Sequence, residues 1–98
     1  MSKGYWVATY RCIVDPAKVA EYVRLAGPAF RAHGGRYVVR GTPCLAYEAG
    51  LLERTVVLEF DSVDAAIKAH DSETYQRALE ALGDGAVRDI RIVEAAGL

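Results

Sequence analysis

The chain has 98 residues, a formal net charge of −1 and an apolar content of 52%. This length makes one domain, residues 1–98, with a single core. The charges are balanced and form no basic block, and no long apolar stretch occurs, so the sequence predicts neither a nucleic-acid surface nor a signal peptide or membrane span.

The first predicted element is a strand over residues 5–14, "YWVATYRCIV". Its β-branched and aromatic content is typical of a strand, and Arg11 is its only charged residue. Strict alternation gives it two apolar faces. One face carries Tyr5, Val7, Thr9 and Ile13, and the other carries Trp6, Ala8, Tyr10, Cys12 and Val14.

A helix follows in "DPAKVAEYVRLAGPAFRAHGG", with Asp15 as N-cap and Pro16 at the first helical position. Pro28 has no N–H to donate, which predicts a kink or a one-turn break in this helix. The pair Gly34-Gly35 ends it, with one glycine expected in the left-handed conformation. A short strand, "RYVVRG", covers residues 36–41.

The second half repeats the pattern. The connection "TPCLAYEAGLLER" is expected to hold a small extra strand at residues 45–48, and "RTVVLEF" (residues 54–60) is the next main strand. Ser62 caps a helix, Ser72 restarts it, and Gly83 stops it. The last strand, "VRDIRIVEA", points Ile90 and Ile92 one way and Arg91 and Val93 the other.

The element order β-α-β-β-α-β indicates an α+β fold, the ferredoxin-like arrangement of a four-stranded antiparallel sheet in the order 4-1-3-2. Right-handed crossovers place both helical segments on one face of this sheet. The first and third main strands read as apolar on both faces, so something must cover the open face. A second copy does so most economically, which predicts a homodimer with two sheets packed face to face, a dimeric α/β barrel.

Four stretches resemble the family catalogued as domain of unknown function 1330: "KGYWVA", "HGGRYVVRG", "VVLEF" and "HDSETYQ". They occur in the same order along nearly the whole chain. The family is placed in the dimeric α/β-barrel superfamily with cofactor-free monooxygenases, haem-degrading enzymes and muconolactone isomerase-like proteins. The resemblance therefore implies a homodimer with a cavity between sheet and helices, and no obligatory cofactor. Similar proteins often have a tyrosine where this chain has His70.

Arg40 is a candidate site residue, because a strand that should lie in a core ends on it. Alternation puts Arg40 on the same face as Arg36 and Val38, pointing into the sheet–sheet space or its rim. There it either pairs with Glu59 or Glu48 as a structural contact, or uses its planar fork of donors to hold a carboxylate or enolate.

Two histidines are further candidates. His33, at the end of the first helix, either interacts with the helix carbonyls or acts as a general base. His70 lies where the two later helical pieces meet. The histidines and cysteines lack metal-ligand spacing, so no protein-bound metal is predicted. Haem is an option through the resemblance only, since no residue identifies an axial ligand. Cys12 and Cys44 are interpreted as buried or half-buried reduced thiols of a cytoplasmic protein.

Tyr22 and Tyr75 lie on the inner stripes of their helices, where aromatic residues either pack in the core or direct a hydroxyl into a cavity. Two hypotheses follow. In the first, a small homodimeric protein binds or converts a small anionic or oxygenated metabolite, with His33 as base, Arg40 as anion anchor and a tyrosine orienting the ligand. In the alternative, the chain is a non-catalytic dimeric ligand-binding or accessory module whose polar groups form structural pairs.

Overall fold

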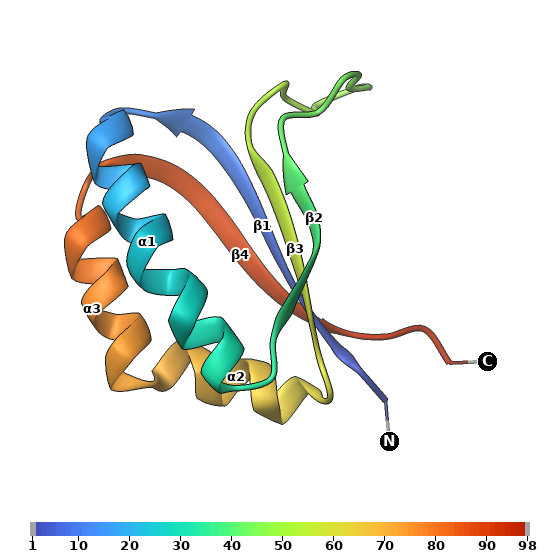
Figure 1. The fold of residues 1–98 in the computed structure, drawn as a ribbon. Coiled ribbons are helices and arrows are strands. Elements are labelled where there is room, and N and C mark those ends of the chain that lie inside the picture. Colours follow the sequence, from blue (N-terminus) through green and yellow to red (C-terminus); the bar gives the residue numbers. More distant parts are fainter. Residues whose placement is uncertain (1, 98) are drawn as a thin grey trace.

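The computed structural model describes residues 2–97 and confirms the α+β, ferredoxin-like prediction (Figure 1). The four strands form one antiparallel sheet in the order β2-β3-β1-β4, the predicted order read from its other edge. The elements are β1 (Gly4–Ile13), α1 (Pro16–Ala32), β2 (Arg36–Gly41), β3 (Thr55–Phe60), α2 (Val63–Asp71), α3 (Glu73–Leu82) and β4 (Ala86–Glu94).

The first helix begins and ends as its sequence predicts. The Asp15 carboxylate accepts hydrogen bonds from the backbone N–H groups of Ala17 and Lys18, at 3.0 and 3.3 Å. Gly34 follows the helix with a φ of 78°, in the region that favours glycine. Of the kink or one-turn break expected at Pro28, the break is absent, since α1 is continuous across that residue. A proline removes one backbone hydrogen bond, and the buried inner face of α1 holds the helix together across that gap.

The second helical segment divides at Ser72, as predicted. Ser62 Oγ accepts a hydrogen bond from Ala65 N–H at 3.0 Å, and Ser72 Oγ accepts one from Tyr75 N–H at 3.2 Å. Each serine thereby satisfies an N–H group that has no partner inside its own helix. Gly83 ends α3 with a φ of 50°. The division brings α3 alongside α1 and leaves α2 near the other end of the sheet (Figure 1).

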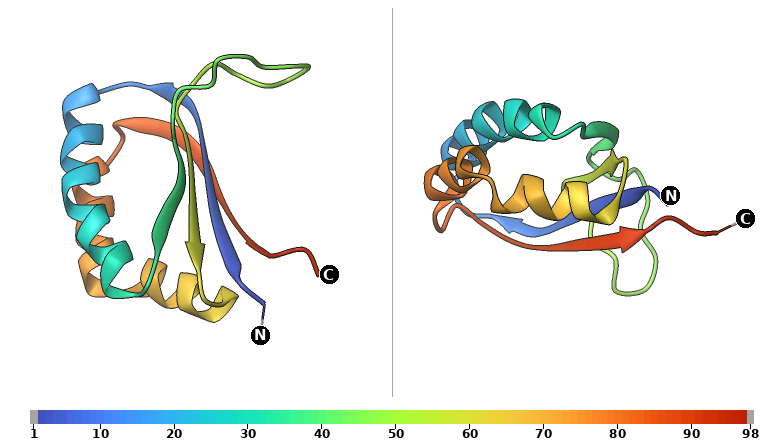
Figure 2. Two further views of the ribbon diagram at one scale, coloured as in Figure 1. Left: turned by 45° about the vertical axis from the view of Figure 1, so that its right-hand side comes forward. Right: turned by 90° about the horizontal axis from the view of Figure 1, so that it is seen from below.

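All three helices lie on one side of the sheet, and the core fills the space between (Figure 2). Trp6 is at its centre and is 1% exposed. Its ring centroid is 5.0 Å from that of Phe30 and 5.1 Å from that of Tyr75, both in edge-on geometry. Gly35 packs so closely here that an added Cβ would lie 2.5 Å from Phe60 Cε2. The aromatic core therefore fixes the distance between α1 and the sheet.

Two bulges overturn the predicted alternation. The register shifts between Tyr10 and Cys12 in β1, so Ile13 pairs with Ala86 and packs against the core instead of sharing a face with Val7. A second shift between Tyr37 and Val39 pairs Arg40 with Val56, whose side chain is buried beneath the helices. An extra residue in one strand exchanges the faces of all residues beyond it. Neither β1 nor β2 has a glycine or proline at its bulge that would mark the position in the sequence.

The open face of the sheet is a mixture rather than an apolar layer. Tyr5, Val7 and Val57 are half-buried there, and charged side chains flank them: Arg36 pairs with Glu59, and both Arg11 and Arg91 pair with Asp89. The expected apolar character thus holds for the middle of the face only. Within residues 2–97, no helix is long and apolar enough to cross a membrane.

The connection between β2 and β3, residues 42–54, extends beyond the sheet on the side away from the helices (Figure 2). It contains no strand at residues 45–48, contrary to the prediction. Cys44 and, in β1, Cys12 are both exposed free thiols, which also corrects the expectation that they are buried or half-buried. Large apolar side chains project from this loop without cover: Leu45, Tyr47, Leu51 and Leu52.

Candidate functional site

A narrow cavity, here called the inner gap, lies between α1 and the helix-facing side of the sheet. Its volume is about 10 Å³, roughly the room that one water molecule requires. Trp6, Phe30 and Leu58 contribute apolar walls. The polar side chains that line it come from four different elements and from the residue before β3: Tyr10, Tyr22, Tyr37, Arg54 and Arg88.

Three of these polar side chains, Tyr10, Tyr22 and Arg88, form a tyrosine–arginine cluster together with the neighbouring Tyr75. The hydroxyl oxygens of Tyr22 and Tyr75 are 2.8 Å apart, within hydrogen-bond distance. Arg88 Nη2 donates to Tyr75 Oη and Arg88 Nη1 donates to Tyr10 Oη, each at 3.3 Å. The Arg88 guanidinium also lies over the Tyr22 ring, with its carbon 4.3 Å from the ring centroid. One cation is thus surrounded by three phenols.

The side chains of this cluster are hydrogen-bond donors at physiological pH, and none of them is a suitable base. Burial raises the pKa of Tyr22 and of Tyr75 above the ordinary value of 10, so both phenols are neutral at physiological pH. Arg88 is protonated at any such pH, because a guanidinium does not lose its proton in proteins. Among residues 2–97, no carboxylate forms an ion pair with Arg88. The cluster can therefore hold an anion, but it offers no group suited to removing a proton.

A larger hollow of about 450 Å³ lies on the opposite side of the sheet, beneath the 42–54 loop. Arg11, Asp89 and Arg91 line it, and the aspartate pairs with both arginines, at 3.1 and 3.4 Å. Both of its arginines thus have a carboxylate partner, Glu53 adds a second acidic side chain to the lining, and the hollow occupies the face that the sequence predicts to be covered by a second copy. The hollow therefore resembles part of an assembly surface more than a ligand site.

The structure places Arg40 away from both of its expected partners. Its guanidinium carbon lies 4.4 Å from the centroid of the Tyr37 ring, and the residue is exposed at the edge of the sheet. Glu59 instead pairs with Arg36, accepts a hydrogen bond from Tyr5 Oη at 2.6 Å and lies 3.6 Å from Lys3 Nζ. The Tyr5 hydrogen bond first, and then the nearby cations, lower the pKa of Glu59. The bulge in β2 is the reason, because it moves Arg40 to the other face.

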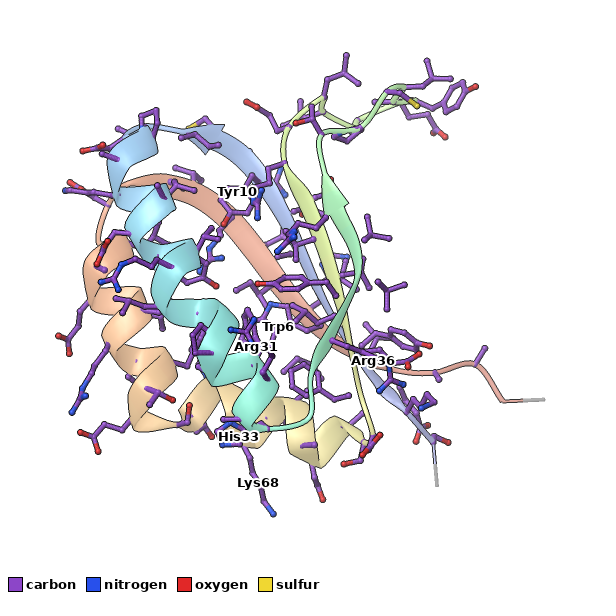
Figure 3. All side chains as sticks on the ribbon, in the orientation of Figure 1. Trp6, Tyr10, Arg31, His33, Arg36 and Lys68 are labelled. Atoms are coloured by element: carbon purple, nitrogen blue, oxygen red, sulfur yellow. The ribbon has the colours of Figure 1, made fainter. Side chains whose placement is uncertain are left out.

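The remaining candidates also lie apart from the inner gap. His33 Nδ1 is 3.0 Å from the carbonyl oxygen of Ala29. The His33 side chain lies at the C-terminal end of α1, far from Tyr10 (Figure 3). The His70 ring packs against the Trp6 ring at the protein surface, and its Nδ1 is 3.0 Å from Asp71 Oδ1. Glu48 is exposed in the 42–54 loop. In the described part of the chain, no three His, Cys, Asp or Glu side chains gather as a metal ion would require.

Of the residues predicted for the site, Tyr22 and Tyr75 are the two that the structure brings together. Sequence reasoning missed Arg88, although alternation from Ile90 and Ile92 places it on the helix-facing side of β4. It also missed Tyr10, which shares a face of β1 with Trp6. A signal was present in both cases: a polar group that occupies a position predicted to face the core.

The comparisons with known proteins agree with this architecture. The family described as "Domain of unknown function (DUF1330)" matches residues 3–96. The chain belongs to this family. Among curated proteins, none matches it significantly.

Three solved structures share the fold of this family member at low sequence identity. A protein of unknown function from Rhodopseudomonas palustris has 21% identity and a TM-score of 0.72, covering 99% of this chain and 83% of its own. A dimeric ferredoxin-like protein of unknown function from Thermobifida fusca has 20% identity, a TM-score of 0.67 and coverages of 96% and 92%. SnoaB, a cofactor-independent oxygenase from Streptomyces nogalater, has 15% identity, a TM-score of 0.64 and coverages of 100% and 97%. At these identities the likeness establishes the fold alone.

Proposed function

We propose that this protein is a homodimer that binds a small anionic metabolite, such as a carboxylate, against Arg88 in the inner gap, without an obligatory cofactor. The observation that carries the proposal is the state of Arg88. It is a partly buried cation among aromatic rings, and within residues 2–97 only neutral phenols accept its hydrogen bonds. A cation removed from water in this way is stabilised when an anion pairs with it.

Binding is better supported than proton transfer. The hypothesis of His33 as a general base requires the imidazole to reach a ligand held by the arginine. His33 hydrogen-bonds within its own helix and does not line the inner gap, and the two buried phenols have raised pKa values. The ligand therefore enters as an anion and is not deprotonated by the gap. This supports a ligand-binding protein, the alternative that was open from the sequence, with a defined anion site.

Entry of a ligand requires the gap to widen. Its volume of about 10 Å³ is too small for a metabolite, so side chains must move before one binds. Arg54 and Arg88 are the most suitable to move, because both are only half-buried and arginine side chains have several rotatable bonds. An anion that draws Arg88 away from the Tyr22 ring leaves a space with aromatic walls behind it.

The homodimer is supported by the open face of the sheet and by the 42–54 loop. Val7, Val57 and Tyr5 form an apolar centre there, and the loop adds exposed leucines beside it. Exposed apolar patches of this kind are typical of protein interfaces. The name of the Thermobifida fusca protein, which describes a dimer, is consistent with a second copy on this face.

The binding proposal is tested by nuclear magnetic resonance titration of the whole chain with acetate and benzoate. The neutral amides acetamide and benzamide serve as shape-matched controls. We expect the acids, and not the amides, to shift the resonances of residues around Arg88. The substitution Arg88→Met should abolish the shifts, whereas Arg77→Met, on the outer face of α3 where the arginine pairs with Glu73, should preserve them. Equal shifts from acids and amides, or unchanged binding in Arg88→Met, would overturn the proposal.

A further inference from the structure

The arginines of this chain divide into two groups. Of the nine arginines in the sequence, five pair with a carboxylate: Arg11, Arg24, Arg36, Arg77 and Arg91. These five lie on the open face of the sheet or on exposed helix surfaces. Among residues 2–97, the other four form no ion pair, and two of them, Arg54 and Arg88, line the inner gap. This cavity thus holds two of the four arginines that have no carboxylate partner within the described residues.

Arg54 and Arg88 belong to one cross-strand row with Tyr10 between them. Tyr10 pairs directly with Arg88 across β1 and β4, and its backbone N–H donates to the carbonyl oxygen of Arg54 at 3.0 Å. The guanidinium carbons of Arg54 and Arg88 are 6.0 and 5.4 Å from the centroid of the Tyr10 ring. Because β3 and β4 flank β1 on opposite sides, the backbones of the two arginines lie on opposite sides of Tyr10.

This row sets the geometry of a ligand. Strands in a sheet lie about 4.8 Å apart, so the backbones of Arg54 and Arg88, two strands apart, are separated by about 10 Å. Because Tyr10 lies between the two arginines in this row, a single small carboxylate is not expected to contact both. A molecule with two acidic groups can contact both arginines, with one acidic group on each. Two like charges left without partners would otherwise repel each other in a partly buried site.

We propose that the inner gap is specific for a two-headed acid, a small molecule with two anionic groups joined by an apolar spacer. One group binds Arg88 within the tyrosine–arginine cluster, the other binds Arg54 directly before β3, and the spacer passes along the Tyr10 ring. This inference rests on the proposed anion site at Arg88 and adds the second anchor. Arg54 is then a specificity-determining residue, because it distinguishes diacids from monoacids.

The test compares adipate with hexanoate, a diacid and a monoacid of equal chain length, by calorimetric or resonance titration of the whole chain. We expect the wild-type protein to bind adipate about tenfold or more tightly than hexanoate, since a second charge-assisted contact adds at least that factor. Glutarate and pimelate, one carbon shorter and longer, show which spacer fits the row. In Arg54→Met, adipate should bind no better than hexanoate does.

The variants at Arg88 separate the two proposals. Arg88→Met should lose both ligands, and Arg88→Lys, which keeps the charge in a smaller side chain, should retain part of the binding and verify that the fold is intact. Hexanoate binding that equals adipate binding in the wild type would overturn the two-headed ligand but leave the Arg88 site standing. An adipate preference that survives in Arg54→Met would do the same. Failure of the wild-type protein to bind either acid would overturn the site itself.

Discussion

The hydroxyl pair of Tyr22 and Tyr75 allows the clearest quantitative prediction. Tyr22→Phe removes one buried hydrogen bond, but Tyr75 Oη still accepts from Arg88, so we expect a loss of about 1 kcal/mol in the free energy of unfolding. Tyr75→Phe removes the acceptor of Arg88 and also leaves the buried Tyr22 hydroxyl without its partner. Both effects add to the cost, which should reach about 2 kcal/mol.

The double variant completes a thermodynamic cycle. Once Tyr75 has lost its hydroxyl, the Tyr22 hydroxyl is a buried polar group without that hydrogen bond, and removing it should cost nothing further. The double variant should therefore lose no more than the about 2 kcal/mol that Tyr75→Phe loses alone, which is a coupling energy of at least about 1 kcal/mol. Urea unfolding followed by circular dichroism measures all four proteins. Tyr47→Phe, whose side chain is 76% exposed, is the matched control and should be neutral. Additive losses, or a larger loss for Tyr22→Phe, would refute the described network.

Two further predictions concern the open face of the sheet. Val57→Arg places a charge in its apolar centre, so sedimentation at micromolar concentration should show a dimer for the wild-type chain and a monomer for the variant; a wild-type chain that sediments as a monomer would contradict the proposed assembly. The pKa of Glu59 is lowered chiefly by the Tyr5 hydroxyl, so its stabilising contribution is present above the ordinary carboxyl pKa and is lost as the pH falls through the lowered one. Comparing unfolding of wild type and Glu59→Gln from neutral pH to about pH 3 should show their difference shrinking as the solution is acidified, and a constant difference would exclude this role.

Much of the fold could be predicted because its signals are local. Asp15 and Ser72 begin helices at the residues where an N-cap is expected, and Gly34 and Gly83 end helices with positive φ values. These effects depend on a side chain and the backbone within a few residues of it. The order of the elements then restricts the topology to very few arrangements, and the ferredoxin-like sheet is one of them.

The candidate site could be predicted only in part, because it depends on which face each strand residue occupies. Tyr22 and Tyr75 were found because helical periodicity is regular along α1 and α3. Arg40 was assigned to the wrong face, since a bulge in β2 exchanges the faces beyond it and depends on the pairing with β3.

Arg88 becomes a candidate site residue only in the folded chain, where β4 pairs with β1 and brings Arg88 opposite Tyr10 and into contact with Tyr75. The amino-acid sequence by itself determined the elements, their order and the apolar faces that bring them together. The tertiary structure decided which arginines find carboxylates and which remain without them, because an ion pair requires two side chains from distant parts of the chain to meet on the same face.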